Sequence, residues 1–186
     1  MTMRKVFRYI LFGLLLGVIV YYFYPDKKLP ENVTIDKIVV LKSKRELQAY
    51  SNGQLIKTYT VSLGGNPIGD KEFEGDKRTP EGLYMINDKN PNSGYFKNLG
   101  ISYPNSEDIV EANKINKPPG GEIKIHGLRN GLGIIGKFQR WMDWTLGCIA
   151  LTNAELDELY NHTSIGTPIE IKPCEPVARV EYADNI

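Results

Sequence analysis

A long apolar run near the N-terminus divides this chain into two physically different parts. From Val6 to Tyr24 the sequence holds about 19 residues with one charge, Arg8, which is close to the roughly 20 residues that a helix needs to cross a bilayer. The chain has 186 residues in all, of which 41% are hydrophobic and 24% are charged. The part that follows the run is therefore long enough for one domain with its own core.

Basic residues precede the apolar run and aromatic residues end it. Arg4, Lys5 and Arg8 favour a cytoplasmic N-terminus by the positive-inside rule, which sends the rest of the chain across the membrane. The aromatic residues 21–24 are typical of the belt at a membrane interface. No small-x-small cleavage site follows, so we expect a retained signal anchor; the alternative is a signal peptide removed at an unusual site.

These features predict five segments. They are a cytoplasmic N-terminus at residues 1–5, a transmembrane signal anchor at 6–24, a linker at 25–33, a folded domain at 34–172 and a C-terminal tail at 173–186. The linker is rich in Lys and Pro. We expect it to act as a short tether that lifts the domain off the membrane.

The charge balance excludes one class of partner. The chain has 23 Lys and Arg residues against 22 Asp and Glu residues, a net charge of +1, and no block of like charge stands out. Proteins that neutralise a phosphate backbone need an excess of basic residues. Nucleic acid is therefore not expected as a partner.

Short β-prone runs follow the linker. Ile35–Leu41, Leu47–Tyr50 and Leu55–Leu63 predict a three-stranded meander. Asn52 and Gly53 lie between the second and third runs, where they can supply the positive φ values of a type I′ hairpin turn. The meander would place three strands side by side at the start of the domain.

Later segments predict more strands and two short helices. Residues 78–86 predict a turn that leads into another strand, and a closing strand is expected at 167–171. Residues 105–115 are typical of a helix with Asn105 or Ser106 as its cap, and Thr152 with Glu155 has the spacing of a capping box. We expect a mainly β domain with short helices and no repeating parallel βαβ unit.

A histidine and a cysteine lie in two β-prone segments with glycine neighbours. Ile123-Lys124-Ile125 leads into His126 and Gly127, and Asp143-Trp144-Thr145-Leu146 leads into Gly147 and Cys148. A thiol is a strong nucleophile only as the thiolate, and an imidazole within hydrogen-bond reach can take its proton and later return one to a leaving group. The pair therefore predicts cysteine-based acyl transfer, with Cys148 and His126 as the catalytic residues.

The same two residues have other interpretations. Cys148 and Cys174 could form a disulfide outside the cytoplasm, although the bridge would consume the thiolate. Cys148, His126, Cys174 and His162 could bind zinc, but no pair has the close spacing of zinc motifs, so we expect no metal. His126 could also be a core histidine bonded to a backbone carbonyl, and we expect His162 to be a solvated or C-capping residue.

Three neighbours of the pair are candidate site residues. The backbone at Gly147 could help to bind an oxyanion. The Thr145 hydroxyl could bind the substrate or the imidazole, although threonine is also common in strands. Arg129 could bind a substrate carboxylate.

The motifs together resemble those of the L,D-transpeptidase catalytic domain, also called the YkuD domain, over roughly residues 35 to 172. The similarity is carried by Thr79-Pro80-Glu81-Gly82, Ile125-His126-Gly127 and the Thr-x-Gly-Cys motif that ends at Cys148. Ser102-Tyr103-Pro104-Asn105 and Asp143-Trp144-Thr145 are similar to the ErfK-like and YafK-like branch. We expect Tyr103 to contact substrate on this basis.

The resemblance implies a β-rich fold of mixed strands without a cofactor. It implies that Cys148 attacks a peptidoglycan stem peptide at its third residue, usually meso-diaminopimelate, with His126 as general base and acid and Gly147 near the oxyanion. It also implies a bacterial inner-membrane protein whose catalytic domain faces the periplasm. Leu146 and Ala150 replace a histidine and an arginine or asparagine found in many members, so substrate contacts are expected to differ.

Three functions remain open from the sequence. Transfer to an amine of a second stem peptide or of a wall-linked lipoprotein would make this a transpeptidase. Transfer to water would make it a hydrolase that uses the same residues. A cell-wall-binding module without enzymatic activity is the third hypothesis.

Overall fold

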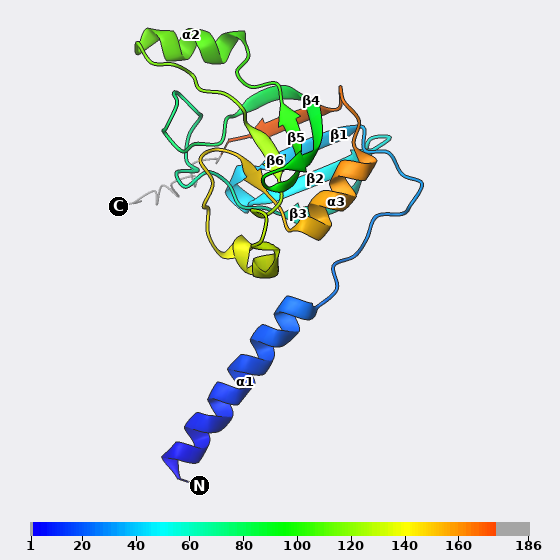
Figure 1. Cartoon of the computed structure of the whole chain (residues 1–186), viewed down its shortest axis with the longest axis vertical. Helices are drawn as coiled ribbons and strands as arrows, with labels where there is room; N and C mark the ends of the chain where they lie inside the picture. The colour runs from blue at the N-terminus through cyan, green and yellow to red at the C-terminus, as the bar shows by residue number, and fades with distance from the viewer. Residues whose placement is uncertain (1, 174–186) are drawn as a thin grey trace, which may run out of the picture.

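A computed structural model describes residues 2–173 of the chain (Figure 1). Helix α1 (Met3–Phe23) leads away from a domain built on one eight-stranded sheet (Figure 1). The helix is long and apolar enough to cross a membrane, and it overlaps the anchor predicted at residues 6–24. A signal sequence would have the same length and composition. Cys174 lies outside the described residues, and so do the disulfide and the zinc set that include it.

The sheet contains both parallel and antiparallel neighbours, in agreement with the predicted fold. Its order is β3-β2-β1-β8-β4-β5-β6-β7, with β1 parallel to β8, β6 parallel to β7 and the other neighbours antiparallel. The strands are β1 (Lys37–Leu41), β2 (Glu46–Ser51), β3 (Gln54–Thr60), β4 (Gly82–Ser93), β5 (Phe96–Ile101), β6 (Lys124–His126), β7 (Ile149–Ala150) and β8 (Pro168–Lys172).

The predicted meander is confirmed in β1, β2 and β3. These strands pair antiparallel in chain order. Asn52 and Gly53 in the turn between β2 and β3 have φ values of 51° and 74°, as a type I′ turn requires. The closing strand is confirmed as β8, which inserts between β1 and β4.

The sheet curls until its two ends meet. The chain that follows β3 pairs with β7 through a bridge between Ser62 and Ala150, and a second bridge joins Gly64 to Thr145. The segment after β3 is therefore placed against the segment that carries the cysteine. Local sequence patterns gave no sign of this contact, because it joins residues more than 80 positions apart.

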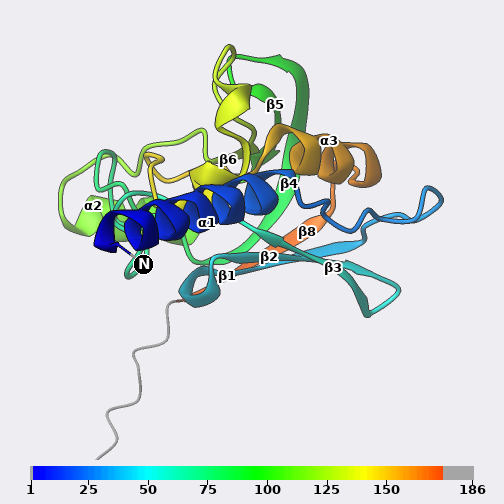
Figure 2. The ribbon, with the colours of Figure 1, turned by 90° about the horizontal axis from the view of Figure 1, so that it is seen from below.

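The core lies inside the curl. It is made of buried aliphatic and tyrosine side chains from the strands and from α3, including Ile38, Val40, Ile125, Ile149 and Leu156. In Figure 2, β1, β2, β3 and β8 form a layer on one side, and α3 lies on the opposite side of the core. Alternate residues of the first layer face outward.

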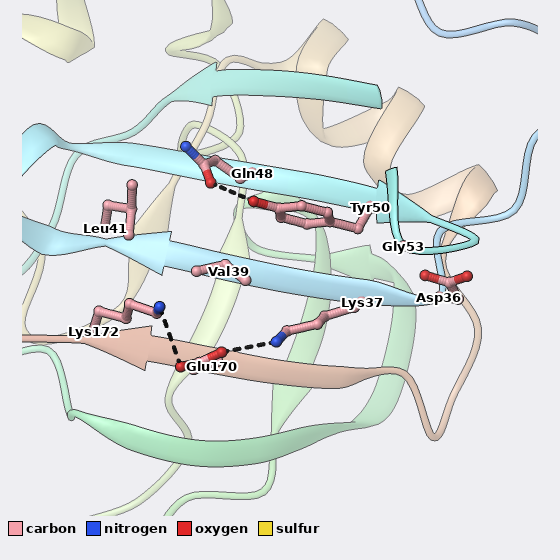
Figure 3. Close-up of a pocket in the computed structure, with 9 residues that line it drawn as sticks. All are labelled: Asp36, Lys37, Val39, Leu41, Gln48, Tyr50, Gly53, Glu170 and Lys172. Carbon is pink, nitrogen blue, oxygen red and sulfur yellow. Dashed lines mark hydrogen bonds and ion pairs between the residues drawn. The ribbon is translucent and has the colours of Figure 1, made fainter. Parts of the chain in front are cut away.

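The outward face of this layer is polar. Glu170 of β8 pairs with Lys37 at 2.9 Å and with Lys172 at 3.5 Å, and the Tyr50 hydroxyl donates to Gln48 at 2.9 Å (Figure 3). The shallow hollow on this face contains no histidine or cysteine. The chemistry predicted from the sequence lies elsewhere in the domain.

Both predicted helices are confirmed with their caps. α2 (Ser106–Lys114) begins after Asn105, which forms a capping box with Asp108. α3 (Asn153–His162) begins after Thr152, which forms one with Glu155. The 3-10 segments η1 (Lys42–Lys44) and η2 (Gly133–Trp141) were not expected, and η2 is kinked at Gly136, whose φ of 49° and ψ of −127° are not helical.

The segment expected to be a free tether is packed against the domain. Leu29 is buried, and its N–H donates to the Glu158 carboxylate at 2.6 Å. Asp26 pairs with Lys137 at 3.1 Å and with Arg140 at 3.4 Å. The sequence pattern missed these contacts because their partners lie more than 100 residues away.

Lys42 is a buried cation that holds the loop before β4. Its side chain is 0% exposed, and its ammonium donates to Gly69 O at 2.7 Å, Thr79 O at 2.8 Å and the Glu81 carboxylate at 2.7 Å. The three partners use all three N–H donors of the ammonium. One side chain therefore joins η1 to the Thr-Pro-Glu-Gly loop.

We expect Lys42→Met to lower the free energy of unfolding by roughly 3–5 kcal/mol, because it leaves a partly buried carboxylate and two carbonyls without their partner. Denaturation of the full chain in mild detergent, followed by tryptophan fluorescence, measures this change. Lys44→Met, in the exposed part of the same short helix, is the matched control, with an expected change within about 0.5 kcal/mol. Equal effects of the two substitutions would contradict the role given to Lys42.

Candidate functional site

One cavity contains both predicted catalytic residues. It has a volume of about 470 Å³ and opens beside the turn between β4 and β5. Its walls come from the β4–β5 turn, β5, β6 and the segment before β7, and they comprise Ser93, Gly94, Tyr95, Asn98, Glu122, Lys124, His126, Trp144, Thr145, Leu146 and Cys148. Residues that are 22 positions apart in the chain thus meet at one surface.

The parallel pairing of β6 and β7 explains why the two residues share a side of the sheet. Ile125 lies opposite Ile149, and both are fully buried in the core. Side chains alternate along a strand, so the neighbours of this pair point away from that part of the core. Lys124 and His126 in β6 and Cys148 just before β7 therefore face the cavity.

The His126 ring is fixed by a backbone carbonyl and two aromatic rings. Nδ1 lies 2.7 Å from Gly127 O, which assigns the proton to Nδ1 and leaves Nε2 as the free base. The Tyr95 ring lies 4.8 Å from the imidazole and the Trp144 ring 5.7 Å from it, centroid to centroid. The carbonyl has the orienting role that a carboxylate has in many catalytic triads.

Thr145 holds the turn that precedes Cys148. Its hydroxyl donates to Cys148 O at 2.7 Å and accepts from the Gly147 N–H at 3.1 Å. Its backbone N–H donates to Leu63 O at 3.1 Å, and its carbonyl accepts from Gly65 N at 2.9 Å. The hydroxyl is therefore already engaged within the turn, where we had expected it to bind substrate or the imidazole.

The turn fits only because two glycines let backbones approach closely. Gly147 has a φ of 131°, and a Cβ there would lie 2.7 Å from Arg78 O. A Cβ at Gly64 would lie 2.1 Å from Lys77 O and 3.0 Å from the Gly147 Cα. Gly64 N also donates to the Thr79 hydroxyl at 3.0 Å. Three backbone segments are thus in direct contact behind the cysteine.

Burial favours the neutral forms of both groups. It raises the pKa of the Cys148 thiol, against the opposing effects of a backbone N–H at Lys124 and the charges of Lys124 and Lys71. Burial likewise lowers the pKa of His126, and the Lys124 charge adds to this, while the hydrogen bond to Gly127 opposes it. The resting pair is therefore a neutral thiol and a neutral imidazole.

The backbone N–H groups of Gly147 and Cys148 differ in their partners. The Gly147 N–H is bonded to Thr145, whereas the Cys148 N–H has no acceptor among residues 2–173. The sulfur itself lies 3.7 Å from Glu122 O. The Cys148 N–H is the donor left available for a ligand at this site.

Asn98 was missed in the sequence analysis. It lies directly opposite His126 in the β5–β6 pair, so both side chains are on one face. The residue is only 4% exposed, and its Oδ1 has no hydrogen-bond partner in the part of the chain that the structure describes. No local signal could have identified it, because β5 and its register were not predicted.

Lys124 was also missed, although a signal was available. It precedes His126 by two residues in a strand, a spacing that places both side chains on one face. Its ammonium lies 3.6 Å from the exposed Glu122 carboxylate at the cavity wall. The sequence could therefore have indicated a cation on the same face as His126.

Two predicted substrate contacts lie outside the cavity. Arg129 is exposed and lines a neighbouring groove. Tyr103 is buried in the core, where its hydroxyl donates to Pro119 O at 2.7 Å. His162 ends α3, with Nδ1 2.6 Å from Val33 O. No group of three metal-binding side chains is placed to hold an ion within residues 2–173.

Comparison with known proteins supplies the family. The model of the YkuD family, described as the L,D-transpeptidase catalytic domain, matches residues 35–171. YafK of Escherichia coli (strain K12), a protein named for the L,D-transpeptidases, is 28% identical over 130 residues, which cover 66% of this chain and 45% of YafK.

Solved structures agree with this assignment. The helical cell shape determining protein Pgp2 of Campylobacter jejuni is 25% identical with a TM-score of 0.58, and the match covers 82% of this chain and 53% of Pgp2. Bd1075 of Bdellovibrio bacteriovorus shares the fold, with a TM-score of 0.52 at 24% identity over 76% of this chain and 49% of that protein. The chain spans about half the length of these relatives. Because the family model matches most of it, the chain belongs to the YkuD family of L,D-transpeptidase catalytic domains.

Proposed function

We propose that this protein is a membrane-anchored cysteine acyltransferase that acts on peptidoglycan stem peptides. The observation that carries the proposal is the shared cavity, in which Cys148 lies with a histidine whose Nδ1 is bonded to a carbonyl and whose Nε2 is free. Family membership supports the substrate class, and the apolar helix α1 supports the anchor.

The first half of the reaction forms a thioester. Nε2 of His126 takes the Cys148 proton as the sulfur attacks the carbonyl carbon of an L,D peptide bond. The Cys148 N–H stabilises the oxyanion, a contribution of roughly 3 kcal/mol for one donor in comparable sites. The C–N bond then breaks, and the imidazolium returns its proton to the departing amine of the D-residue.

The second half transfers the acyl group. An acceptor amine gives a proton to Nε2 as it attacks the thioester carbonyl, a new peptide bond forms, and the sulfur leaves and regains a proton from His126. An amine on a second stem peptide or on a lipoprotein gives a crosslink. Water as the acceptor gives a shortened peptide instead, and the same residues serve both reactions.

Polar groups on the cavity wall suit a peptide with carboxylates. The Lys124 ammonium lies beside the sulfur, where it can pair with a carboxylate of the stem peptide. The buried Oδ1 of Asn98, which has no partner in the described structure, can accept a hydrogen bond from a peptide N–H beside His126. These two side chains are our candidates for substrate contacts.

We expect Cys148→Ala to abolish product formation, with turnover reduced by roughly three orders of magnitude or more. The full chain in detergent is incubated with muropeptides, and mass spectrometry identifies crosslinked or shortened products. A carbapenem, which acylates reactive thiols, should add its mass to the wild-type chain and not to the variant. Cys174→Ser is the matched control and should retain activity. Unchanged products from the Cys148 variant would favour the non-enzymatic hypothesis.

The neutral resting pair predicts a particular pH dependence. Because burial lowers the pKa of His126, the base form persists below the ordinary histidine pKa of about 6.5, and the acid limb of kcat/KM should lie below that value. Because burial raises the pKa of Cys148, alkylation by iodoacetamide should still accelerate above about pH 8.5. The alkylation is measured in a Cys174→Ser background. A rate plateau reached below neutral pH would instead indicate a thiolate–imidazolium pair.

Lys124→Gln should raise KM roughly 10-fold or more with little change in kcat, since it removes a charge-assisted hydrogen bond to the substrate carboxylate. Steady-state kinetics with a stem peptide measure both constants. A peptide whose carboxylate is amidated should give the same KM with the wild type and with Lys124→Gln, because it lacks the group that Lys124 would bind. Arg129→Gln is the matched control. A larger increase in KM for Arg129→Gln than for Lys124→Gln would indicate that Arg129, as expected from the sequence, binds the substrate carboxylate.

A further inference from the structure

We propose that η2 (Gly133–Trp141) and the adjoining Met142 form a membrane-contact surface that seats the catalytic domain on the lipid headgroups. This surface is called the η2 face below. The inference rests on α1 crossing the membrane, as proposed above. It concerns the orientation of the domain and does not depend on catalysis.

The end of the anchor is packed against η2. The Tyr22 hydroxyl donates to Ile134 O at 2.6 Å, and a Cβ at Gly136 would lie 2.9 Å from the Tyr22 ring. The Tyr21 ring stacks on Trp141 with centroids 6.0 Å apart. Figure 1 shows η2, drawn in yellow, at the upper end of α1. The last turn of the helix is therefore fixed against this segment.

Ion pairs hold the junction in place. Asp26, two residues after the aromatic run, pairs with Lys137 and Arg140 of η2, and Arg140 also pairs with Glu155 of α3 at 2.7 Å. Lys137 also donates to the carbonyl of Tyr24. With these contacts the chain after α1 cannot extend as a spacer without breaking several interactions.

The η2 face is apolar and exposed beside this junction. Ile134 is 81% exposed, Met142 68% and Trp141 63%. An apolar patch of this kind on a water-facing surface would be costly, and such patches mark sites of contact. Tyrosines at the end of a spanning helix mark the depth of the membrane interface, and η2 contacts those same tyrosines.

The position of the patch identifies lipid as its occupant. A helix that spans the bilayer and ends against η2 brings the η2 face to the bilayer surface, so lipid is the material next to it. Lys27 and Lys28 are exposed directly after the anchor, where they can pair with lipid phosphates. Apolar side chains with flanking lysines are the composition of an interfacial segment.

Seating the η2 face places the catalytic cavity near the membrane. Tyr95 and Trp144 line the catalytic cavity and also an apolar groove of about 550 Å³ formed by η2. The groove and the cavity are thus neighbours separated by two aromatic side chains. The enzyme would then act on wall peptides or lipid-linked acceptors close to the bilayer.

The two tryptophans of the chain allow a direct test. Full-length Trp144→Phe and Trp141→Phe variants each retain one tryptophan and are reconstituted in vesicles that contain lipids brominated near the headgroup end of the acyl chain. Interfacial segments bury their apolar face roughly 5–10 Å into the headgroup boundary. Trp141 fluorescence should therefore be quenched strongly, and that of Trp144, in the cavity wall, much less.

A second variant tests the surface itself. Ile134→Glu combined with Met142→Glu in the Trp144→Phe background should remove most of the Trp141 quenching while the thermal unfolding in detergent is unchanged. Cys148→Ala should leave the quenching as it is, so the result does not depend on activity. Trp141 quenching no greater than that of Trp144 would overturn the inference, and products formed by the wild-type chain in the same vesicles would show that the proposed function still stands.

Discussion

The site depends on the close contact of three backbone segments behind Cys148. The turn that carries the cysteine touches the segment after β3 at Gly64 and the loop before β4 at Arg78, at distances that exclude a Cβ at Gly64 or Gly147. Thr145 fastens the turn to the segment after β3 through backbone hydrogen bonds, and Lys42 fastens the loop before β4 from beneath. The cysteine is therefore presented by a rigid base, which is what a preorganised acyl-transfer site needs.

Chemistry at this site starts from neutral groups. Burial disfavours both the thiolate of Cys148 and the imidazolium of His126. The carbonyl of Gly127 orients the ring without adding a negative charge that would stabilise the imidazolium at rest.

Helix α1 and the folded domain are in contact through η2. A flexible tether would let the domain sample a wide volume of the wall, whereas the packed junction would fix its distance from the bilayer. The charges that hold the junction come from both sides, with Asp26 on the chain after α1 and Arg140 on η2. Arg140 also reaches α3, so the junction is tied to the helix that packs on β5 and β6.

The sequence by itself determined the features that depend on neighbouring residues. These are the apolar N-terminal helix, the meander with its Asn-Gly turn, both helix caps, the mainly β class and the motifs that place the chain in its family. Such features depend on local hydrogen bonds and on side-chain periodicity. A short stretch of sequence is therefore enough to predict them. The spacing of Lys124 and His126 belongs to this group, although it was overlooked.

Only the tertiary structure decided which distant residues meet. The β5–β6 register brings Asn98 to His126, the closure of the sheet brings Gly64 to the turn before Cys148, and the packing of η2 brings Trp141 to Tyr21 of α1. It also placed Tyr103 in the core and Arg129 outside the cavity. Register and packing depend on the whole set of buried surfaces at once, and for this physical reason no local pattern could indicate these contacts.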